Sequence, residues 1–549
     1  MSVVEKRVFP SMNQASDRDP FNNNCYGTLV DTPYKQVNLP ILDVSEFNDR
    51  TIRAYEEGYG EKDLEADLAL ARSLVPAGTA SLRDFSYVAP EIPEYIPSNC
   101  TGCMDCVTEC PDTAILGKVL AESTLEQKLQ TVAEADREMF AFQWSKTRKY
   151  YEGPQKKGQE GGRFAIIIDP SKCKGCAECV TVCDDGALKM IPKTDKKIQD
   201  IRKSHRLFKE FGPSDEKYIN ENLLIDMMLK EKTHIYVGGA GSCAGCGEGT
   251  ALRMMCAATG AKYGDQWAIV AATGCNTVYT STYPYNPYLV PWTNSLFENA
   301  PADAMGVRSR WDQKGWGDKP IWCIGGDGAM FDIGFQSLSR MLASGANIKV
   351  FVLDTQVYSN TGGQASTSTY TGQNTKMSVH GKAYGGKQER RKEISQIAMM
   401  HPRTYVAQTT AAHTNHFYKA VLGALEFDGP AIITCYTTCQ PEHGVADNMA
   451  SDQARLAVDT RAFPLMIYDP RAGDTIKKRL SLQGNPAMKE DWWTNPKTGE
   501  TVDFIDFCRS EGRFSKHFDK DGNPSELLLY AKQDRLENWH VLQELAGLR

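Results

Sequence analysis

Short apolar runs alternate with stretches of helical periodicity from about residue 234 onwards. In the stretch that follows residue 326, apolar side chains recur at helical spacing, at Met330, Ile333, Leu338, Met341 and Leu342. Five apolar runs have the length of strands: 234–239 (HIYVGG), 266–272 (QWAIVAA), 320–326 (PIWCIGG), 348–354 (IKVFVLD) and 430–436 (PAIITCY). Buried strands that alternate with helices are typical of βαβ units. The pattern therefore predicts an α/β domain with a parallel sheet over residues 233–455.

The pattern before this region is less regular. Ser123 and Glu126 have the spacing of a capping box, and Leu125, Leu129, Val132 and Phe140 follow at helical intervals. We therefore expect a helix inside an insertion at 116–165. This insertion could cover a cofactor, form a docking surface or simply be a solvated helix.

Composition narrows the class of protein. The 549 residues suffice for about three or four domains. Hydrophobic residues make up 41% and charged residues 24%, as in ordinary soluble proteins, and the net charge of −7 gives no reason to expect nucleic acid or an anionic membrane as partner. No apolar run is long enough to span a bilayer, and the first residues lack a secretory signal. We therefore expect a cytoplasmic protein.

Cysteine usage points to metal binding. Seventeen cysteines in a chain without a secretory signal are not expected to form a disulfide framework. Residues 100–111 (CTGCMDCVTECP) and 173–183 (CKGCAECVTVC) each place four cysteines at the spacing of bacterial ferredoxins with two [4Fe–4S] clusters. In that pattern, the fourth cysteine of each run binds the cluster of the other run.

Two ligand sets follow from this pattern. They are Cys100, Cys103, Cys106 and Cys183 for one cluster, and Cys173, Cys176, Cys179 and Cys110 for the other. A pair of zinc knuckles is the alternative, but zinc sites close with ligands in a 2+2 arrangement. Asp184 stands where proline usually follows the fourth cysteine. Residues 91–232 are therefore predicted to form a two-cluster ferredoxin-like domain.

Four further cysteines follow predicted strands. Cys243 and Cys246 follow the first strand, Cys275 the second and Cys439 the fifth. Ligands of open α/β sheets collect at the carboxyl ends of the strands, so these cysteines are predicted to hold a third [4Fe–4S] cluster. A redox dithiol at the first two is the weaker alternative. The remaining cysteines are Cys256, Cys323 and Cys435, predicted as core thiols, and Cys25 and Cys508, which have no motif around them.

A phosphate site is predicted where the third strand runs into Gly326-Asp327-Gly328. A helix that begins there presents free amides to a phosphate group, and the Asp327 carboxylate suits Mg²⁺. The loop at 355–360 lies one crossover later and could supply the other oxygens.

This turn with the asparagine-bearing loop resembles a thiamine-diphosphate signature. Together, DTQVYSNTGGQ and GSCAGCGEG resemble the pyruvate:ferredoxin oxidoreductase family, over about residues 70–549. The resemblance implies that Asp327, Thr355 and the Val357 carbonyl bind Mg²⁺, with Asp354 as the alternative to Thr355. It implies catalytic roles for Asn360 and Glu248. The coenzyme-binding residues that it implies are Gly326, Asp327, Gly328, Ala329, Thr355, Val357, Asn360 and Thr361.

The resemblance also implies an activity and partners. The expected reaction is oxidative decarboxylation of pyruvate to acetyl-CoA and CO₂, or its reverse, with coenzyme A as co-substrate. Electrons would pass through three clusters to ferredoxin or flavodoxin. Two alternatives are the same chemistry on 2-oxoglutarate or another 2-oxoacid, and an electron-transfer subunit with a vestigial diphosphate site.

The family's pyrimidine-binding and coenzyme A regions have no counterpart in this sequence. We therefore expect a second subunit in a hetero-oligomer, such as a dimer of heterodimers. The N-terminal extension (1–90) and the charged C-terminal extension (456–549) are the segments expected to wrap around it, although parts of both could be solvated tails.

Overall fold

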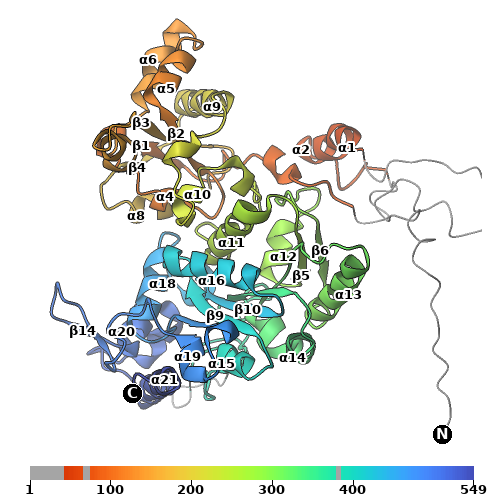
Figure 1. The fold of residues 1–549 in the computed structure, drawn as a ribbon, viewed down its shortest axis with the longest axis vertical. Coiled ribbons are helices and arrows are strands. Elements are labelled where there is room, and N and C mark those ends of the chain that lie inside the picture. The colour runs from red at the N-terminus through yellow and green to blue at the C-terminus, as the bar shows by residue number, and fades with distance from the viewer. Residues whose placement is uncertain (1–42, 66–73, 379–384) are drawn as a thin grey trace, which may run out of the picture.

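An eight-stranded sheet forms the centre of the larger part of the molecule (Figure 1). The computed structural model describes residues 43–65, 74–378 and 385–549, so Cys25 lies outside the described residues. The strand order is β12-β11-β9-β10-β8-β7-β5-β6, with β11 and β12 antiparallel to their neighbours and the others parallel. The strands are β5 Ala268–Ala272, β6 Trp292–Ser295, β7 Ile321–Gly326, β8 Lys349–Asp354, β9 Tyr405–Thr410, β10 Ala431–Tyr436, β11 Met466–Tyr468 and β12 Leu480–Ser481. The predicted α/β class with a largely parallel sheet is confirmed.

Four of the five predicted strands are present, as β5, β7, β8 and β10. The strand predicted at 234–239 is wrong, because Tyr236 makes only an isolated bridge to Tyr288. Gly238 and Gly239 both have positive φ angles, which end an extended conformation. A Cβ on Gly239 would lie 1.9 Å from the Ala80 carbonyl oxygen. This segment therefore packs against other chain segments instead of extending the sheet.

The helix predicted after residue 326 is interrupted. A π-helical turn, η8 Gly328–Ile333, precedes α14 Phe335–Ala343, and Gly334 separates them. A Cβ at Gly334 would lie 2.6 Å from the carbonyl oxygens of Ala329 and Phe297. Of the five apolar residues at helical spacing, Ile333 is 47% exposed and the other four are buried.

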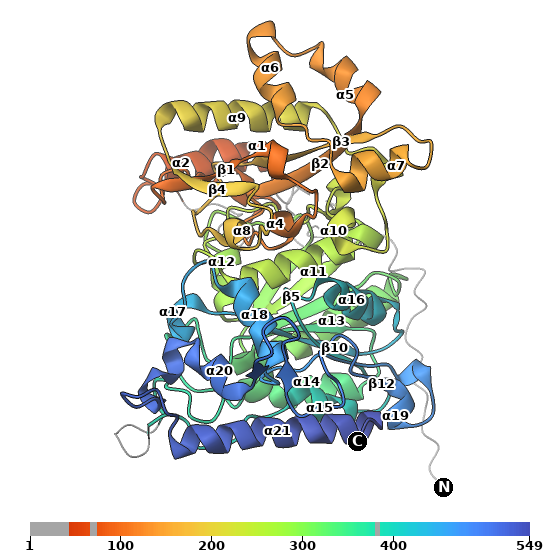
Figure 2. The same cartoon turned by 90° about the vertical axis from the view of Figure 1, so that its left-hand side faces the viewer.

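The cluster region, residues 91–232, is built on two small antiparallel sheets. These pair β1 Glu91–Tyr95 with β4 Leu188–Pro192, and β2 Ile115–Ala121 with β3 Gly162–Ile168. Its helices include α4 Asp105–Thr108, α5 Glu122–Leu129, α6 Glu134–Phe142, α8 Glu178–Thr181, α9 Asp195–Glu210 and α10 Leu224–Met227. Figure 2 shows that this region covers one side of the sheet region, with α11 Gly247–Tyr263 between them.

Two details of the predicted insertion need correction. Its ends are strands, because β2 and most of β3 fall within 116–165. The helix predicted from Ser123 to Phe140 is two helices, α5 and α6, and the capping box is wrong because α5 begins after Ala121. The Glu160 carboxylate accepts a hydrogen bond from the Ser123 amide at 2.8 Å and satisfies the start of α5 instead.

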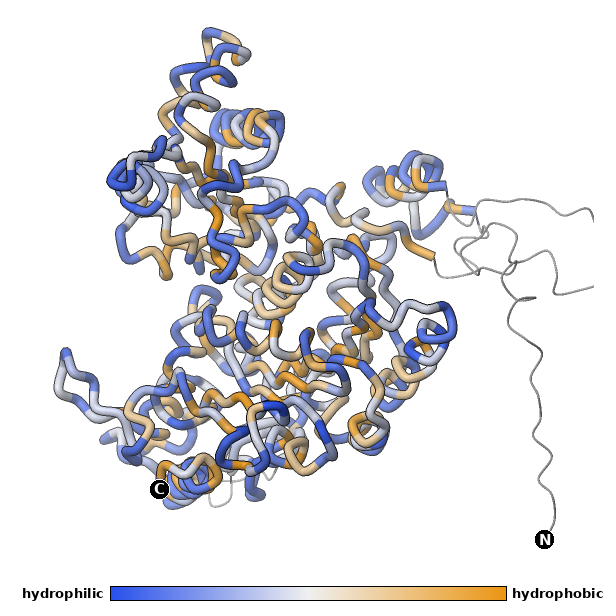
Figure 3. Tube along the Cα trace, viewed as in Figure 1, coloured by the Kyte–Doolittle hydropathy of each residue, from blue (hydrophilic) through white to orange (hydrophobic). Residues whose placement is uncertain are grey.

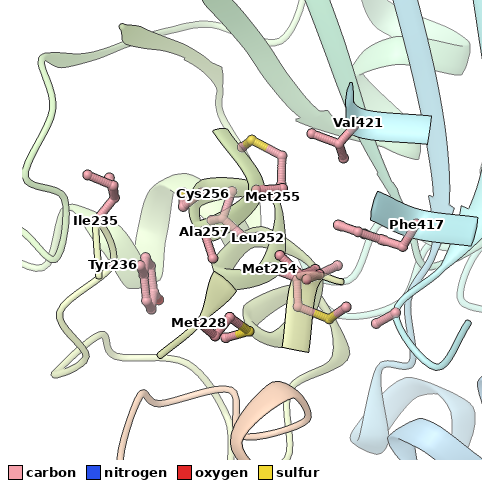
Figure 4. Close-up of a cluster of buried hydrophobic side chains, with 14 of the residues drawn as sticks. Met228, Ile235, Tyr236, Leu252, Met254, Met255, Cys256, Ala257, Phe417 and Val421 are labelled. Atoms are coloured by element: carbon pink, nitrogen blue, oxygen red, sulfur yellow. The ribbon is translucent and has the colours of Figure 1, made fainter. Parts of the chain in front are cut away.

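Helix α11 is buried on all sides. Its residues Leu252, Met254, Met255 and Cys256 are fully buried and pack with residues such as Phe417 and Val421 of α16 Thr414–Glu426 (Figure 4). The helix also buries Glu248 and Arg253, so it lies inside the core rather than presenting only one face to it. Cys323 and Cys435 are also fully buried, which confirms the predicted core thiols, and Cys508 shares this environment.

The C-terminal residues fold onto the sheet region. Strands β11 and β12 belong to the central sheet, which therefore extends beyond residue 455. Helix α21 Glu526–Ala546 buries Leu528, Trp539 and Leu542 against the same chain. The hydropathy colouring in Figure 3 shows apolar residues gathered in the interior of the sheet region. A solvated tail is therefore excluded for this helix, while contact with a partner subunit stays a prediction.

The remaining helices surround these two regions. They are α1 Val44–Phe47, α2 Arg53–Glu56, α7 Gly153–Gln155, α12 Cys275–Thr280, α13 Ala300–Gln313, α15 Ile394–Met399, α17 Gln440–His443, α18 Ala450–Asp459, α19 Ile476–Arg479 and α20 Phe504–Arg509. Among the described residues, none of the helices combines the length and the apolar character that crossing a membrane requires.

Candidate cofactor sites

A cavity at the carboxyl edge of the sheet gathers the residues predicted for the diphosphate coenzyme. Its lining includes Glu248, Gly326, Asp327, Gly328, Ala329, Thr355, Val357, Asn360 and Thr361. These residues come from three segments that the parallel sheet brings to one edge. Cys275, one of the predicted ligands of the third cluster, lines the same cavity.

Three oxygen atoms meet at the Thr355 hydroxyl. Its Oγ1 lies 3.1 Å from Oδ1 of Asp327 and 3.0 Å from the Val357 carbonyl oxygen. Ser366 and Ser368 both donate hydrogen bonds to Oδ2 of Asp327, the second at 2.9 Å. A carboxylate, a hydroxyl and a carbonyl form the hard oxygen donor set that Mg²⁺ prefers beside phosphate oxygens. The residues present therefore fit a magnesium diphosphate.

Asp354 is turned away from this cavity. It is fully buried, its Oδ2 pairs with Arg391, and its Oδ1 accepts a hydrogen bond from the Gln356 amide at 3.1 Å. Gln356 has a φ of 54°, in the left-handed region. The chain thus turns sharply after β8 so that Thr355, rather than Asp354, reaches the cavity lining.

Two carboxyl groups of the cavity titrate abnormally. Burial and the nearby charge of Asp327 raise the pKa of Glu248 to about 8. Glu248 is 4% exposed, and its Oε2 atom has no hydrogen-bond partner. Burial and the charge of Asp354 raise the pKa of Asp327 to about 7, although hydrogen bonds from Ser366 and Ser368 act in the opposite direction. An orphaned, protonated Glu248 in a cavity can donate a hydrogen bond to a bound group.

The sequence alone did not indicate several residues of this cavity. Thr273, Gly274, Phe297, Tyr358 and Ser359 also line it. A Cβ on Gly328 would lie 2.5 Å from the Tyr358 ring, so a larger residue there would displace this ring from the cavity wall. Tyr358 and Ser359 lie inside the loop that the sequence had marked, whereas no pattern distinguished Phe297.

The two ferredoxin-type cysteine sets each surround a cavity. One cavity is lined by Cys100, Cys103, Cys106 and Cys183, and the other by Cys110, Cys173, Cys176 and Cys179. We call these set I and set II. Their empty volumes are similar, about 350 and 340 Å³. Each fourth cysteine thus lies with the first three of the other run, as the predicted exchange requires.

Set I lies nearer the surface than set II. Cys103 is exposed and Cys100 and Cys183 are half-buried, whereas Cys110 and Cys173 are buried. Burial raises the pKa of Cys103 to about 11 and of Cys173 to about 12. Free thiols at these positions are therefore protonated, and a bound iron–sulfur core would supply the positive charge that makes them thiolates.

The third predicted set gathers at the sheet edge. The Gly247 amide donates a hydrogen bond to the Thr438 carbonyl oxygen at 3.1 Å, which brings the segment of Cys246 against that of Cys439. The pKa of Cys275 is raised by burial, then by Glu248 and by the thiols of Cys246, Cys439 and Cys243. Helix α11 begins directly after Cys246, and the Gly249 amide donates a hydrogen bond to that sulfur. Amides directed at sulfur are a common feature of iron–sulfur sites.

No group of three His, Cys, Asp or Glu side chains suited to a single metal ion occurs among the described residues. The proposed magnesium donors at Asp327, Thr355 and Val357 do not form such a group, because only Asp327 among them is a carboxylate.

His443 joins the diphosphate loop to the third cysteine set. Its Nε2 lies 2.8 Å from the Thr355 carbonyl oxygen, and its Nδ1 accepts a hydrogen bond from the Cys439 amide at 3.4 Å. The ring is fully buried, and its Nδ1 lies 3.7 Å from Glu511. Burial lowers the pKa of His443 well below its usual value, so the ring is neutral. Sequence motifs gave no sign of this residue.

Comparison with known families agrees with this arrangement. Residues 272–435 match the C-terminal TPP binding domain of thiamine pyrophosphate enzymes, and residues 99–188 match the 4Fe-4S dicluster domain. The fold and the site thus define a protein that binds thiamine diphosphate and iron–sulfur clusters.

Three curated relatives sharpen this class. Pyruvate synthase subunit PorB of Pyrococcus horikoshii is 39% identical over 255 residues, which cover 45% of this chain and 76% of that protein. A probable pyruvate-flavodoxin oxidoreductase of Escherichia coli is 28% identical over 73% of this chain and 38% of its own length. Pyruvate:ferredoxin oxidoreductase of Moorella thermoacetica is 27% identical over 92% of this chain and 46% of its own length. The chain belongs to the pyruvate:ferredoxin oxidoreductase family.

The chain thus spans less than half the length of the two longer relatives. Among solved structures, the 2-oxoglutarate:ferredoxin oxidoreductase of Magnetococcus marinus matches with a TM-score of 0.32 and 23% identity, covering 36% of this chain and 64% of that one. That score is too low to carry an argument.

Proposed function

We propose that this chain is the coenzyme-binding, electron-relaying part of a 2-oxoacid:ferredoxin oxidoreductase that acts on pyruvate. The reaction is oxidative decarboxylation with coenzyme A to acetyl-CoA and CO₂, or its reverse. One observation carries the proposal, namely that Cys275 lines the same cavity as Asp327, Thr355 and Asn360. A diphosphate site and an electron-accepting site side by side are what a coupled decarboxylation and oxidation requires.

The cavity residues have distinct roles in this proposal. Asp327, the Thr355 hydroxyl and the Val357 carbonyl hold Mg²⁺, which agrees with the engagement of Asp354 by Arg391. Bound thiamine diphosphate supplies the carbon nucleophile and the electron sink for loss of CO₂. Glu248, protonated near neutral pH, donates a hydrogen bond into the cavity, and the Asn360 amide orients the substrate oxygens.

Three four-iron clusters form the electron relay in this proposal. The cysteines at the sheet edge hold the first, set II the second and set I the third. Set I contains the exposed Cys103 whereas set II has no exposed cysteine, which supports set I rather than set II as the cluster that delivers electrons to ferredoxin or flavodoxin. Exposure does not order the third set, since its Cys243 is exposed as well. This arrangement predicts about twelve iron atoms per chain.

A second subunit completes the active site in this proposal. The longer relatives have more than half of their length outside the region matched here, which leaves room for the pyrimidine-binding and coenzyme A regions. Phe297 lines the cavity. Its neighbour Leu296 is 57% exposed, and Ile333 is 47% exposed. Exposed apolar side chains beside a cofactor cavity support coverage by a partner, in a hetero-oligomer.

Co-purification of the chain with its partner tests this function. The complex should contain thiamine diphosphate and reduce a dye when pyruvate and coenzyme A are added, and 2-oxoglutarate should give a much lower rate. A complex that binds no thiamine diphosphate would favour the electron-transfer subunit with a vestigial site. A preference for another acid would correct the substrate and leave the chemistry intact.

A further inference from the structure

Helix α11 carries a buried arginine without a carboxylate partner. Arg253 is 4% exposed and lies two turns after Cys246. Its Nη1 donates hydrogen bonds to the carbonyl oxygens of Cys110 at 3.1 Å, Thr108 at 3.4 Å and Val107. Within the described residues, no carboxylate oxygen lies within 4.0 Å of the guanidinium group.

The carboxyl groups nearest to Arg253 do not pair with it. Asp112 forms an ion pair with Lys174 at 2.7 Å. Glu109 offers a backbone carbonyl to this helix, which accepts a hydrogen bond from Thr250 Oγ1 at 3.2 Å. A buried cation is unfavourable unless a charge of opposite sign lies nearby.

Three other buried arginines of this chain pair with a carboxylate, whereas the buried Arg461 donates hydrogen bonds to carbonyl groups and lies over the Trp539 ring. Arg391 pairs with Asp354, Arg513 with Glu511 and Arg535 with Asp534 at 2.7 Å. Arg253 has no such partner, and one of the three carbonyl groups that it contacts belongs to Cys110, a cysteine of set II. The position of the Arg253 guanidinium therefore indicates that its counter-ion is the negatively charged group bound by the cysteines of set II.

We propose that Arg253 is the counter-ion of the cluster held by set II and raises the reduction potential of that cluster. This inference rests on the proposed assignment of set II as four-iron ligands. A four-iron core with four thiolates carries net negative charge, and reduction adds one more electron to it. A buried cation beside it stabilises the reduced form more than the oxidised form.

The two cysteine cavities differ in the charged residues that line them. The lining of set I includes Asp185 and no basic residue, whereas the lining of set II includes Lys174 together with Asp112 and Glu178. Helix α11 also connects the first two members of the proposed relay, since it begins directly after Cys246 of the third set and contacts Cys110 of set II through Arg253. Arg253 would therefore favour arrival of the electron at set II after it leaves the coenzyme cavity.

The test compares Arg253→Gln with Arg253→Lys in the complex of this chain with its partner. Glutamine keeps an N–H donor for the carbonyl groups but removes the charge, whereas lysine keeps the charge. Redox titration followed by electron paramagnetic resonance reads each cluster separately. In Arg253→Gln, the reduction equilibrium of one cluster should shift about tenfold towards the oxidised form, which is about 59 mV for one electron. The other two clusters should be unchanged, and Arg253→Lys should resemble the parent protein.

Thr250→Val provides a structural control, because it removes a hydrogen bond from α11 to Glu109 without changing any charge. It should leave all three potentials unchanged. Unaltered potentials in Arg253→Gln with full iron content would overturn the inference, as would equal shifts in the Gln, Lys and Val variants. If Arg253→Gln does not fold, a shift in Arg253→Lys as large as tenfold would overturn it. A parent protein with fewer than three clusters would instead contradict the proposed function.

Discussion

The cluster region and the sheet region differ in what holds them together. The cluster region relies on two-stranded sheets, and its buried interior includes Cys106, Cys110, Cys173 and Cys179 themselves. Two-stranded sheets are marginally stable on their own. The sheet region instead contains an eight-stranded sheet with long apolar strands such as β7 and β8, whose residues are nearly all buried. We therefore expect the iron–sulfur clusters to be needed for the stability of the cluster region. The diphosphate coenzyme, which binds at one edge of the sheet, is not expected to be needed for the stability of the sheet region.

Removal of iron should give the largest effect and separate the two regions. Without clusters, the cluster region loses its cross-links and buries four protonated thiols, so β2 and β3 should lose amide hydrogen-exchange protection completely. Strands β7 and β8 should keep theirs. Exchange measured before and after treatment with an iron chelator and an oxidant checks this. Equal loss in both regions would contradict the comparison.

Asp327→Ala should affect only the sheet region. Loss of a magnesium ligand should weaken thiamine diphosphate binding by more than about 100-fold, since even changes in outer-shell groups typically cost 10- to 100-fold. Iron content should stay at the value of the parent protein. Calorimetry and iron analysis measure the two effects, with Asp318→Ala at an exposed position as control. Simultaneous loss of coenzyme and iron would mean that the two sites are not independent.

His443→Leu should affect both coenzyme binding and the third cluster, whereas Asp327→Ala should affect coenzyme binding alone. Loss of the hydrogen bonds to the Thr355 carbonyl and from the Cys439 amide should lower coenzyme affinity about tenfold. It should also change the resonance spectrum of the third cluster but not of the other two. His443→Gln, which keeps a donor and an acceptor, should restore part of both properties. A spectrum that does not change would show that Cys439 is not a ligand held by this residue.

The smallest effect is expected from His416, which should make the free energy of unfolding of the sheet region decrease at acid pH. Burial, with His413 and Lys419 nearby, lowers the pKa of His416 to about 3. In the unfolded chain the His416 ring binds a proton near pH 6.5, whereas in the folded chain it stays neutral until about pH 3. The free energy of unfolding therefore has its full value above pH 6.5 and decreases as the pH falls below it. The loss amounts to about 2 kcal/mol at pH 5.

His416→Leu should therefore show a flatter decline in unfolding free energy between pH 7 and pH 5. Urea titrations that follow the sheet region check this. The same decline in the parent and the variant would show that His416 is not protonated on unfolding in this range.

Local spacing explains what the sequence could predict. The cysteine runs at 100–111 and 173–183 place their ligands within a few residues of one another, so the sets could be written down before the fold was known. The strand ends that carry Asp327 and Cys275 were also visible, because parallel strands bring their carboxyl ends to one edge.

Residues brought in by long loops could not be predicted. Ser366 and Ser368 reach Asp327 from about 40 residues further along the chain, and His443 lies four residues past Cys439 in a short helix with no motif. The false strand at 234–239 failed because Gly238 and Gly239 accommodate close packing with distant backbone atoms, which hydropathy does not show. Tertiary contacts, rather than local preference, decided each of these cases.

The adjacency of the diphosphate site and the third cysteine set is the central claim. Mn²⁺ in place of Mg²⁺ provides a direct measurement, because this paramagnetic ion speeds the spin relaxation of a reduced cluster that lies close to it. In the complex with its partner, we predict enhanced relaxation for one of three clusters, and loss of that effect in Asp327→Ala. Equal relaxation of all clusters, or of none, with Mn²⁺ bound would contradict the account.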